Sequence, residues 1–404
     1  MKKKILIIVI SAVLVVALGV TGLLLFLKKP DNSTEVPKGK DKPLTGIDAC
    51  FTEDMNYYNE SPSVVRVGGE QYMFYTRNEV AKDNTTSTIF VRKATFENGK
   101  WVYGDPIKAL SRTTDSWDSA AIFAADVIKG EFKYKGKTYT YLMAYNGSKK
   151  TNRNNAQIGF AVSNKIDGEY IRVGTNPIIE YDKTTQTPVG LTNYKGVVEP
   201  SLVSCDTKGK LTVFYTFYGK FNSSYAIQMD CSDLEHIVMS GRMKINVSGI
   251  TDGYENTTLY GGDYSYNPDD GTYIVCRNYG GAVSGLPSVS EAIQVVTCKG
   301  SEMFKVNDNA PNETPTPVWK LYNSARRRIS AIHTAVDDIN DLSRSNGYKR
   351  IYNACIASDE YGYILSTRSV EIYFTSSAVS GDDGLTGDEY LFTPMIHEYL
   401  LQRS

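Results

Sequence analysis

Three acidic residues lie within or at the start of short apolar or aromatic strands, where a charged side chain requires an explanation. Glu199 interrupts the apolar run Gly196–Val203, and Asp126 and Asp263 each begin a run of their own. Burying a carboxylate without a partner is costly. Carboxyl groups that meet in one pocket can instead act as general acid and general base. The competing interpretation is a solvent-facing Glu on an edge strand, a place that the neighbouring Pro200 would tolerate.

The strand pattern around Glu199 recurs along the chain. Each copy contains a polar residue, a short strand, a polar turn and an aromatic strand such as Tyr72–Thr76. A repeated unit of this kind predicts a β-propeller, in which equivalent positions of every blade face one axis. We therefore expect an all-β, five-bladed β-propeller with long connecting loops and one central pocket. The aligned polar residues expected around that pocket are Ser61, Asp126, Glu199, Asp263 and Asn353.

Composition narrows the class of protein. The chain has 404 residues, with 44 Lys and Arg against 45 Asp and Glu, so no basic surface for a nucleic acid is expected. The 29 Tyr and 33 Gly suit an all-β domain with many turns. Aromatic side chains also stack on sugar rings, although core packing accounts for most of them.

The six cysteines have no metal-ligand spacing such as C-x-x-C. In an exported domain an even number of cysteines permits disulfides. Cys50 precedes the first repeat and Cys355 lies in the last, so a bond between them would close the ring. Free buried thiols are an equally good interpretation, because Cys packs well as a small apolar residue.

The N-terminus contains a candidate membrane segment. Residues 5–27 carry no charge and are long enough to cross a bilayer as a helix. We expect residues 1–29 to form an N-terminal membrane anchor rather than a cleaved signal peptide, since no small-residue cleavage site precedes Lys28. The basic start favours a cytoplasmic N-terminus, which leaves the large domain outside the cell membrane.

The remaining chain divides by composition. Residues 30–45 are rich in Lys, Asp and Pro and are expected to form a flexible polar linker. Residues 46–404 are expected to form the propeller, because no long stretch shows helical periodicity and the length suits one domain of this kind. The segment Arg328–His333 is expected to lead into the fifth blade.

Four motifs follow one another along the chain. They are Ser61–Gly68 with Tyr72–Thr76, Trp117–Ser119 with Ala124–Ile128, Ile158–Ser163 with Asp167–Tyr170, and Val198–Ser201. In this order and register they resemble the five-bladed β-propeller glycoside hydrolases of family 43, the arabinosidases and β-xylosidases. The resemblance extends from residue 50 to about residue 375, and it implies hydrolysis of glycosidic bonds in pentose-containing or related polysaccharides by an inverting acid/base mechanism.

The resemblance implies roles for the acidic residues. Glu199 would be the general acid, and Asp126 would tune that acid and help orient the sugar. The chain departs from the family at Ser61, where the family has an Asp that acts as general base. Glu60 is adjacent but should point to the opposite face of its strand. The base role is therefore assigned to Asp263 as a hypothesis, against the alternative that Asp263 caps a turn.

Other residues are expected to contact the ligand. Ser61, Trp117 and Asn353 are candidates for substrate binding. The resemblance also implies a structural calcium ion near the axis beside His333, although a packed core histidine is an equal alternative. No cofactor is expected to be required.

Two classes of function remain open at this stage. The first is a membrane-anchored glycosidase outside the cytoplasm with a carbohydrate substrate. The second is a catalytically inactive propeller that binds carbohydrate or another protein, which the replacement at Ser61 favours. Nothing in the sequence indicates an oligomer, so a monomer is the default.

Overall fold

The computed structural model describes residues 49–51, 56–83, 85–181, 195–218, 223–250, 259–279, 292–305, 317–324, 329–330, 350–377 and 395–404. The chain divides into two units, Met1–Lys42 and Pro43–Ser404, and every described residue belongs to the second. The expected anchor and linker, residues 1–45, and His333 lie outside the described residues. In the described ranges, no helix has the length and apolar character needed to cross a bilayer.

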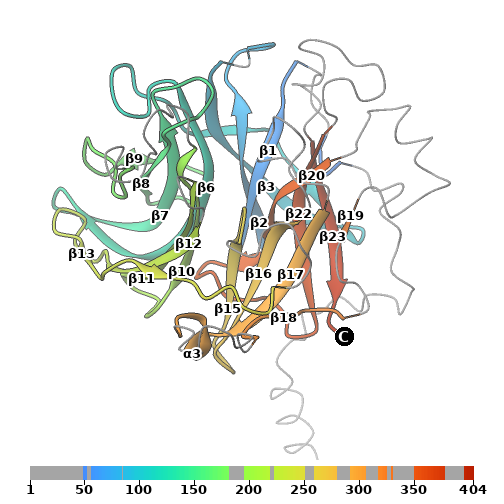
Figure 1. The fold of residues 1–404 in the computed structure, drawn as a ribbon. Coiled ribbons are helices and arrows are strands. Elements are labelled where there is room, and N and C mark those ends of the chain that lie inside the picture. Colours follow the sequence, from blue (N-terminus) through green and yellow to red (C-terminus); the bar gives the residue numbers. More distant parts are fainter. Residues whose placement is uncertain are drawn as a thin grey trace, which may run out of the picture. The chain divides into compact units, whose positions relative to one another are not determined.

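The second unit is built from five antiparallel blades whose innermost strands contact one another in a closed cycle (Figure 1). The cycle closes because the innermost strand of the last blade contacts that of the first. A closed cycle of sheets is a β-propeller. The prediction of an all-β fold with five blades is therefore confirmed for the described residues. In chain order, the innermost strands are β1 (Asn59–Val67), β6 (Ala121–Tyr134), β10 (Gly196–Ser204), β15 (Asp263–Asn267) and β20 (Arg350–Ile356).

The first two blades are joined by one backbone pairing. Ser87 in blade 1 pairs in parallel with Ala121 in blade 2, so the two blades form one continuous sheet. Blade 1 continues with β2 (Glu70–Asn78), β3 (Ser87–Glu97), β4 (Lys100–Tyr103) and β5 (Ile107–Leu110). Blade 2 continues with β7 (Lys137–Ser148), β8 (Gln157–Ser163) and β9 (Ile171–Arg172).

Blades 3 to 5 repeat this antiparallel plan. Blade 3 continues with β11 (Lys210–Tyr218), β12 (Ser223–Asp230), β13 (Val238–Met239) and β14 (Met243–Lys244). Blade 4 continues with β16 (Thr272–Tyr279), β17 (Ala292–Lys299), the short helix α3 (Gly300–Met303), β18 (Lys320–Leu321) and β19 (Ile329–Ser330). Blade 5 continues with β22 (Ser369–Ser377) and β23 (Met395–Gln402), and the intervening β21 (Ser358–Asp359) pairs with β1.

One strand lies in a different blade from the one expected. The backbone of β19, Ile329–Ser330, pairs with β17 of blade 4. The expectation that Arg328–His333 leads into blade 5 is therefore wrong for these two residues. In the sequence, a short apolar run does not indicate which of two neighbouring sheets it will join.

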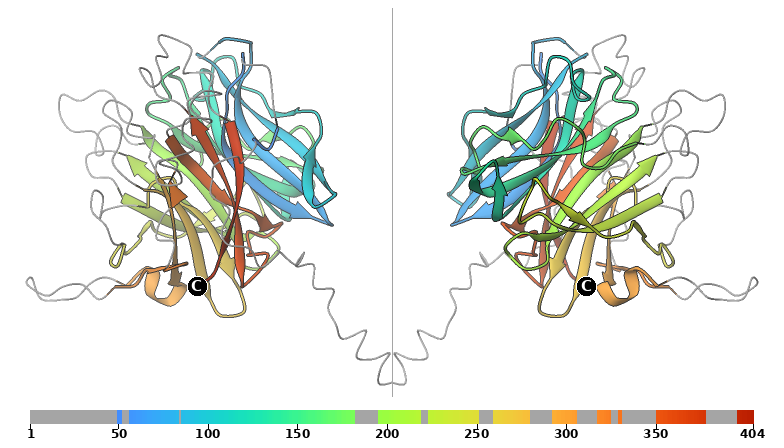
Figure 2. Two further views of the ribbon diagram at one scale, coloured as in Figure 1. Left: turned by 90° about the vertical axis from the view of Figure 1, so that its right-hand side faces the viewer. Right: turned by 90° about the vertical axis from the view of Figure 1, so that its left-hand side faces the viewer.

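The ring is closed by backbone pairing and not by a disulfide. The N–H of Cys50 donates to the carbonyl of Ile396 at 2.8 Å, and Ala49 pairs with His397. The residues at the start of the domain thus extend the outer edge of blade 5. In both views of Figure 2 the strands of blade 5, in red, lie beside those of blade 1, in blue. All six cysteines are free, so the hypothesised bond from Cys50 to Cys355 is wrong.

Each junction between blades is filled by its own hydrophobic cluster. The second strand of a blade is buried on both faces, as the unbroken buried run Gln71–Thr76 illustrates. Such strands have continuous apolar and aromatic sequences, because both faces pack against neighbouring blades. Each cluster contains a large buried side chain from such a second or third strand. These are Phe74 between blades 1 and 2, Phe160 between blades 2 and 3, Phe214 between blades 3 and 4, Ile372 between blades 4 and 5, and Tyr373 between blades 5 and 1.

Candidate active site

Where each blade reaches the axis, a residue in or just before its innermost strand has a left-handed backbone conformation. In four of the five strands, the pairing with the second strand shifts register at this residue, which is the signature of a β-bulge. A positive φ is uncommon for residues other than glycine and is often found at functional sites. We call these residues the upper layer: Ser61 (φ 53°), Ala124 (48°), Glu199 (60°), Gly261 (56°) and Asn353 (45°).

A second ring of side chains lies two residues further along each strand. The expected single ring is therefore wrong in register, because Asp126 and Asp263 belong to this second ring and not to that of Glu199. Aligning the five strands on their polar residues grouped these two acids with Glu199. The bulges show instead which positions of the strands are equivalent. We call the second ring the lower layer: Ser63, Asp126, Ser201, Asp263 and Cys355.

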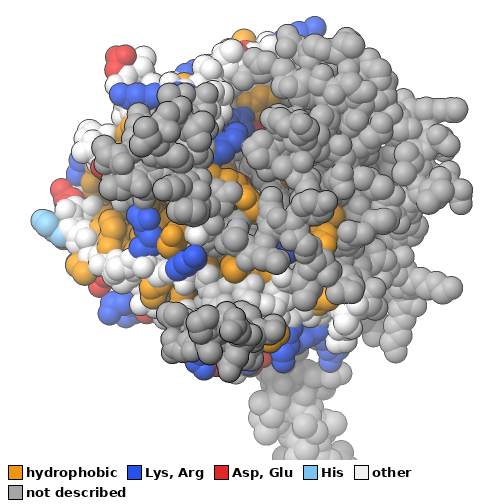
Figure 3. Space-filling view, viewed as in Figure 1, with side chains coloured by type: hydrophobic (Ala, Val, Ile, Leu, Met, Phe, Trp, Pro, Cys, Tyr) orange, Lys and Arg blue, Asp and Glu red, His pale blue; other side chains and the backbone are white. Residues whose placement is uncertain are grey.

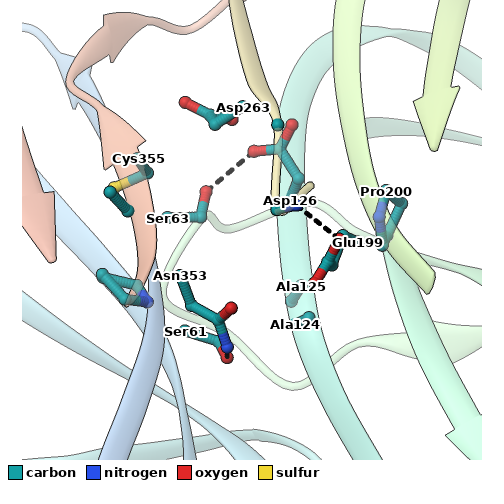
Figure 4. Close-up of a pocket in the computed structure, with 14 residues that line it drawn as sticks. Ser61, Ser63, Ala124, Ala125, Asp126, Glu199, Pro200, Asp263, Asn353 and Cys355 are labelled. Atoms are coloured by element: carbon teal, nitrogen blue, oxygen red, sulfur yellow. Dashed lines mark hydrogen bonds between the residues drawn. The ribbon is translucent and has the colours of Figure 1, made fainter. Parts of the chain in front are cut away.

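All residues of the two layers except Ser201 line one central cavity of about 400 Å³, part of which is open to solvent. Figure 4 shows Asp126, Asp263 and Glu199 around this space, with Ser61 and Asn353 on the opposite side. Five of the predicted site residues thus meet at the axis, although they come from strands far apart in the sequence.

In the lower layer, Asp126 links three blades. Its Oδ1 accepts hydrogen bonds from the hydroxyl of Ser63 at 2.7 Å and from the N–H of Val127 at 3.0 Å. Its Oδ2 accepts a hydrogen bond from the N–H of Leu202 at 2.6 Å. Ser63 belongs to blade 1 and Leu202 to blade 3, so the carboxylate of blade 2 joins both neighbours.

Asp263 performs the same task two blades further round the ring. Its Oδ1 accepts from the hydroxyl of Ser201 in blade 3 at 3.0 Å. Its Oδ2 accepts from the N–H of Ile356 in blade 5 at 2.8 Å. Burial raises the pKa of both Asp126 and Asp263, and the negative charge of Asp126 raises that of Asp263 further. Two acids so close together resist carrying two full charges at neutral pH.

In the upper layer, Glu199 is the acidic member. The N–H of Gly261 in blade 4 donates to its Oε2 at 2.7 Å. Burial raises the pKa of Glu199 to about 7, despite opposing contributions from that hydrogen bond and from the nearby charge of Lys195. A carboxyl group with a pKa near neutrality retains its proton in a large fraction of molecules and is suited to general-acid work.

The upper layer depends on polar side chains that sequence reasoning missed. Four upper-layer residues donate their N–H to a side chain on the second strand of the preceding blade. In blade 4, Gly261 donates instead to Glu199. The missed residues share a detectable signal, a polar residue at the same place in each second strand. The four hydrogen bonds run from Ala124 to Thr76 (3.0 Å), from Glu199 to Asn146 (2.8 Å), from Asn353 to Asn278 (2.8 Å) and from Ser61 to Thr375 (3.0 Å).

Ser61 and Asn353 form a neutral pair. The side-chain amide of Asn353 donates to the hydroxyl of Ser61 at 2.9 Å. The adjacent Glu60 is not among the residues that line the central cavity. It forms an ion pair with Arg153, which also donates to the hydroxyl of Tyr58 at 3.0 Å. As expected, Glu60 does not take the position of the missing carboxylate.

One further predicted site residue, Trp117, is not at the axis. Trp117 lines a different cavity, on blade 2, together with Tyr181. His333 lies outside the described residues. Within the part of the chain that the structure describes, no group of three or more His, Cys, Asp or Glu is arranged to hold a metal ion. No described residues therefore offer a ligand set for the expected calcium ion.

The visible surface is mixed in charge. On the face in Figure 3, the described Lys and Arg side chains occur in several separate groups among hydrophobic and uncharged ones. Nucleic-acid binding proteins instead gather their basic side chains into a continuous patch or stripe.

Solved glycoside hydrolases share this fold. A family 117 glycoside hydrolase from the marine bacterium Zobellia galactanivorans has a TM-score of 0.50 and 14% identity, covering 89% of this chain and 89% of that one. An alpha-L-arabinofuranosidase from Podospora anserina, in complex with cellotriose, has a TM-score of 0.50 and 11% identity, with coverages of 86% and 91%. A GH43_1 enzyme from Xanthomonas citri has a TM-score of 0.50 and 11% identity, with coverages of 88% and 90%.

The sequence comparisons give no closer assignment. No family model matches the sequence, and no curated protein matches it. At 11–14% identity, the structural likeness shows the fold. The resemblance to the propeller glycoside hydrolases thus extends to the fold of the described residues, and the chemistry must be argued from the cavity itself.

Proposed function

We propose that the chain is a glycoside hydrolase that cleaves glycosidic bonds in pentose-containing or related polysaccharides. One observation carries this proposal: Glu199, with a pKa raised to about 7, shares the central cavity with the paired acids Asp126 and Asp263. Glycosidic hydrolysis needs one protonated and one ionised carboxyl group, and their different environments keep such groups in different protonation states.

Glu199 supplies the proton for the leaving group. Its burial keeps the carboxyl protonated near neutral pH, so that the proton passes to the glycosidic oxygen as the bond to the anomeric carbon breaks. The carboxylate left behind is stabilised by the N–H of Gly261 and by the charge of Lys195. Both groups are already in place before the reaction, so little reorganisation is needed.

The lower-layer pair supplies the base. Because Asp126 and Asp263 resist a double negative charge, together they hold about one charge near neutral pH. In the proposed step, Asp263 in its ionised form accepts a proton from a water molecule whose oxygen attacks the anomeric carbon from the face opposite the leaving group. Asp126 shares in the charge and tunes the pair. Attack from the opposite face inverts the configuration at that carbon.

A second candidate function is carbohydrate binding without hydrolysis. The observation that favours it is the hydrogen bond from Asn353 to Ser61, because these two uncharged side chains occupy the upper-layer positions across from Glu199. A cavity of this kind can hold a sugar through its hydroxyl groups while lacking a strong base at the rim.

Hydrolysis of aryl pentosides by the wild type, Glu199→Gln and Asp263→Asn tests the proposal. Loss of activity in both variants is expected, and unchanged activity in both would remove it. Ser61→Asp separates the two candidates. If the wild type is inactive and Ser61→Asp hydrolyses the substrate, the natural chain is a binding protein with an otherwise complete site.

We also propose that residues 5–27 anchor the chain in the cell membrane with the propeller outside the cytoplasm. The uncharged run between two groups of lysines supports this. Such a position would give the cavity access to polysaccharides outside the cell. Protease treatment of intact cells tests it, since digestion of the propeller without lysis is expected and full protection would contradict it.

A further inference from the structure

A second cavity opens on blade 2 and encloses about 590 Å³ of space, part of it solvent. The residues that line it combine aromatic, amide and lysine side chains. They are Trp117, Ser148, Lys149, Lys150, Asn154, Asn155, Gln157 and Tyr181.

Trp117 is fixed against the sheet by two glycines. A Cβ atom on Gly147 would lie 2.4 Å from the indole Cζ3, and one on Gly159 would lie 2.6 Å from Cζ2. Any other residue at either position would displace the indole. The ring also stacks on Tyr145, with centroids 5.6 Å apart and an interplanar angle of 22°.

Asp118, the residue after Trp117, holds this segment in place through buried polar contacts. Asp118 is fully buried and forms an ion pair with Arg172 at 2.7 Å. It also accepts a hydrogen bond from the hydroxyl of Tyr145 at 3.1 Å, the same ring on which Trp117 stacks. A half-buried aromatic side chain held in this way binds a ligand with little loss of conformational entropy.

The polar rim of the cavity is equally well ordered. In the turn between β7 and β8, the hydroxyl of Ser148 donates to the carbonyl of Asn154 at 2.7 Å and accepts from the N–H of Lys150 at 3.0 Å. This turn carries Lys149 and Lys150, and no Asp or Glu lies among the described residues that line the cavity. The charged side chains among these described residues are therefore both basic.

The same turn connects this cavity with the rim of the central one. Ser148 pairs with Ala121, which precedes the upper-layer residue Ala124 on β6, so the turn lies at the upper-layer end of blade 2. Arg153, within the turn, forms its ion pair with Glu60, the neighbour of Ser61.

We propose that this cavity is a second carbohydrate-binding site, for an acidic sugar residue whose ring stacks on Trp117 and whose carboxylate faces Lys149 and Lys150. The aromatic surface supplies the contact area for the sugar ring, the amides of Asn154 and Gln157 supply hydrogen bonds to hydroxyl groups, and the lysines select for negative charge. Binding here requires no catalysis at the axis.

The test is binding of trigalacturonate to the full-length protein, followed by calorimetry and by tryptophan fluorescence. Trp117→Ala should weaken binding by at least about tenfold, the value of one lost stacking contact. Lys149→Glu, at an exposed position, should weaken it about three- to fivefold without affecting packing. Lys100→Glu, an identical charge change at an exposed position on blade 1, is the matched control and should bind like the wild type.

Neutral xylotriose tests whether binding depends on the negative charge of the sugar, and it should bind more weakly than trigalacturonate. Three results would each overturn the proposal. They are equal binding of the two sugars by the wild type, wild-type affinity in both Trp117→Ala and Lys149→Glu, and no binding of trigalacturonate by the wild type. Glu199→Gln should retain the binding. Failure of hydrolysis at the axis would therefore leave this result unaffected.

Discussion

In the lower layer of the central cavity, both carboxylate oxygens of Asp126 and of Asp263 accept hydrogen bonds from neighbouring blades. In the upper layer, the backbone of Glu199 has a strained left-handed conformation. Its carboxylate accepts a hydrogen bond from the N–H of Gly261. The three side chains have similar chemistry and share one cavity. The difference teaches that each lower-layer acid joins two neighbouring blades through both of its oxygens, whereas the upper-layer acid accepts a hydrogen bond from blade 4 at one oxygen.

Glu199→Gln tests the role of the upper-layer acid. Loss of the general acid should reduce hydrolysis by roughly 10²- to 10⁴-fold. The Gln carbonyl can still accept the N–H of Gly261, so the thermal melting temperature at pH 5 should stay near that of the wild type. Activity and melting are measured on the same preparation, and a large drop in melting temperature with full activity would reverse the assignment.

Asp126→Asn tests whether the lower-layer acids join the blades. The carboxylate accepts three hydrogen bonds, and an amide NH₂ would face a donor at one of them. Leaving buried donors unpaired should lower the free energy of unfolding by about 2–4 kcal/mol. Urea denaturation measures this, and a variant as stable as the wild type would mean that the lower layer does not join the blades.

The pH dependence of stability sharpens the comparison. The pKa of Glu199 rises from 4.5 to about 7 on folding, so its contribution to stability is complete below pH 4.5 and is lost as the pH rises through about 7. The loss amounts to at most about 3 kcal/mol. Denaturation curves at pH 4.5 and pH 8 should show a smaller decline for Glu199→Gln than for the wild type. Identical declines would argue against a raised pKa.

Thr76→Val gives the smallest expected effect. It removes the hydroxyl that accepts the N–H of Ala124 while keeping the volume of a buried side chain. The unpaired N–H should cost about 1–2 kcal/mol of unfolding free energy. Thr138→Val, on an exposed position of β7, is the matched control and should change stability by less than about 0.5 kcal/mol. Equal effects of the two would show that the upper layer needs no support from Thr76.

The sequence predicted the fold more reliably than the register of the site. Five aromatic strands after five polar turns were sufficient to predict five blades, because a strand buried on both faces has a recognisable composition. The displacement of Asp126 and Asp263 by two positions could not be foreseen. It depends on the bulge at Ala124 and on the left-handed conformation of Gly261 just before β15, and an alanine does not mark a bulge in the sequence.

Other differences have similar physical causes. Cys50 was expected to meet Cys355, but backbone hydrogen bonds at Cys50 and Ala49 already close the ring. Trp117 was expected to bind substrate from its motif alone. Its actual surroundings depend on Gly147 and Gly159, which belong to two other strands and are not adjacent to it in the sequence.

The closure of the ring has a consequence for biosynthesis. β23 is the last strand along the chain, and the residues that pair with its edge, Ala49 and Cys50, precede every other described strand. A ribosome producing this chain releases four potentially complete blades before the partner for Ala49 exists. Until β23 is synthesised, the ring of blades stays open and Ala49 and Cys50 have no strand to pair with. The pairing that closes the ring joins residues far apart in the sequence, so this step is expected to be slow.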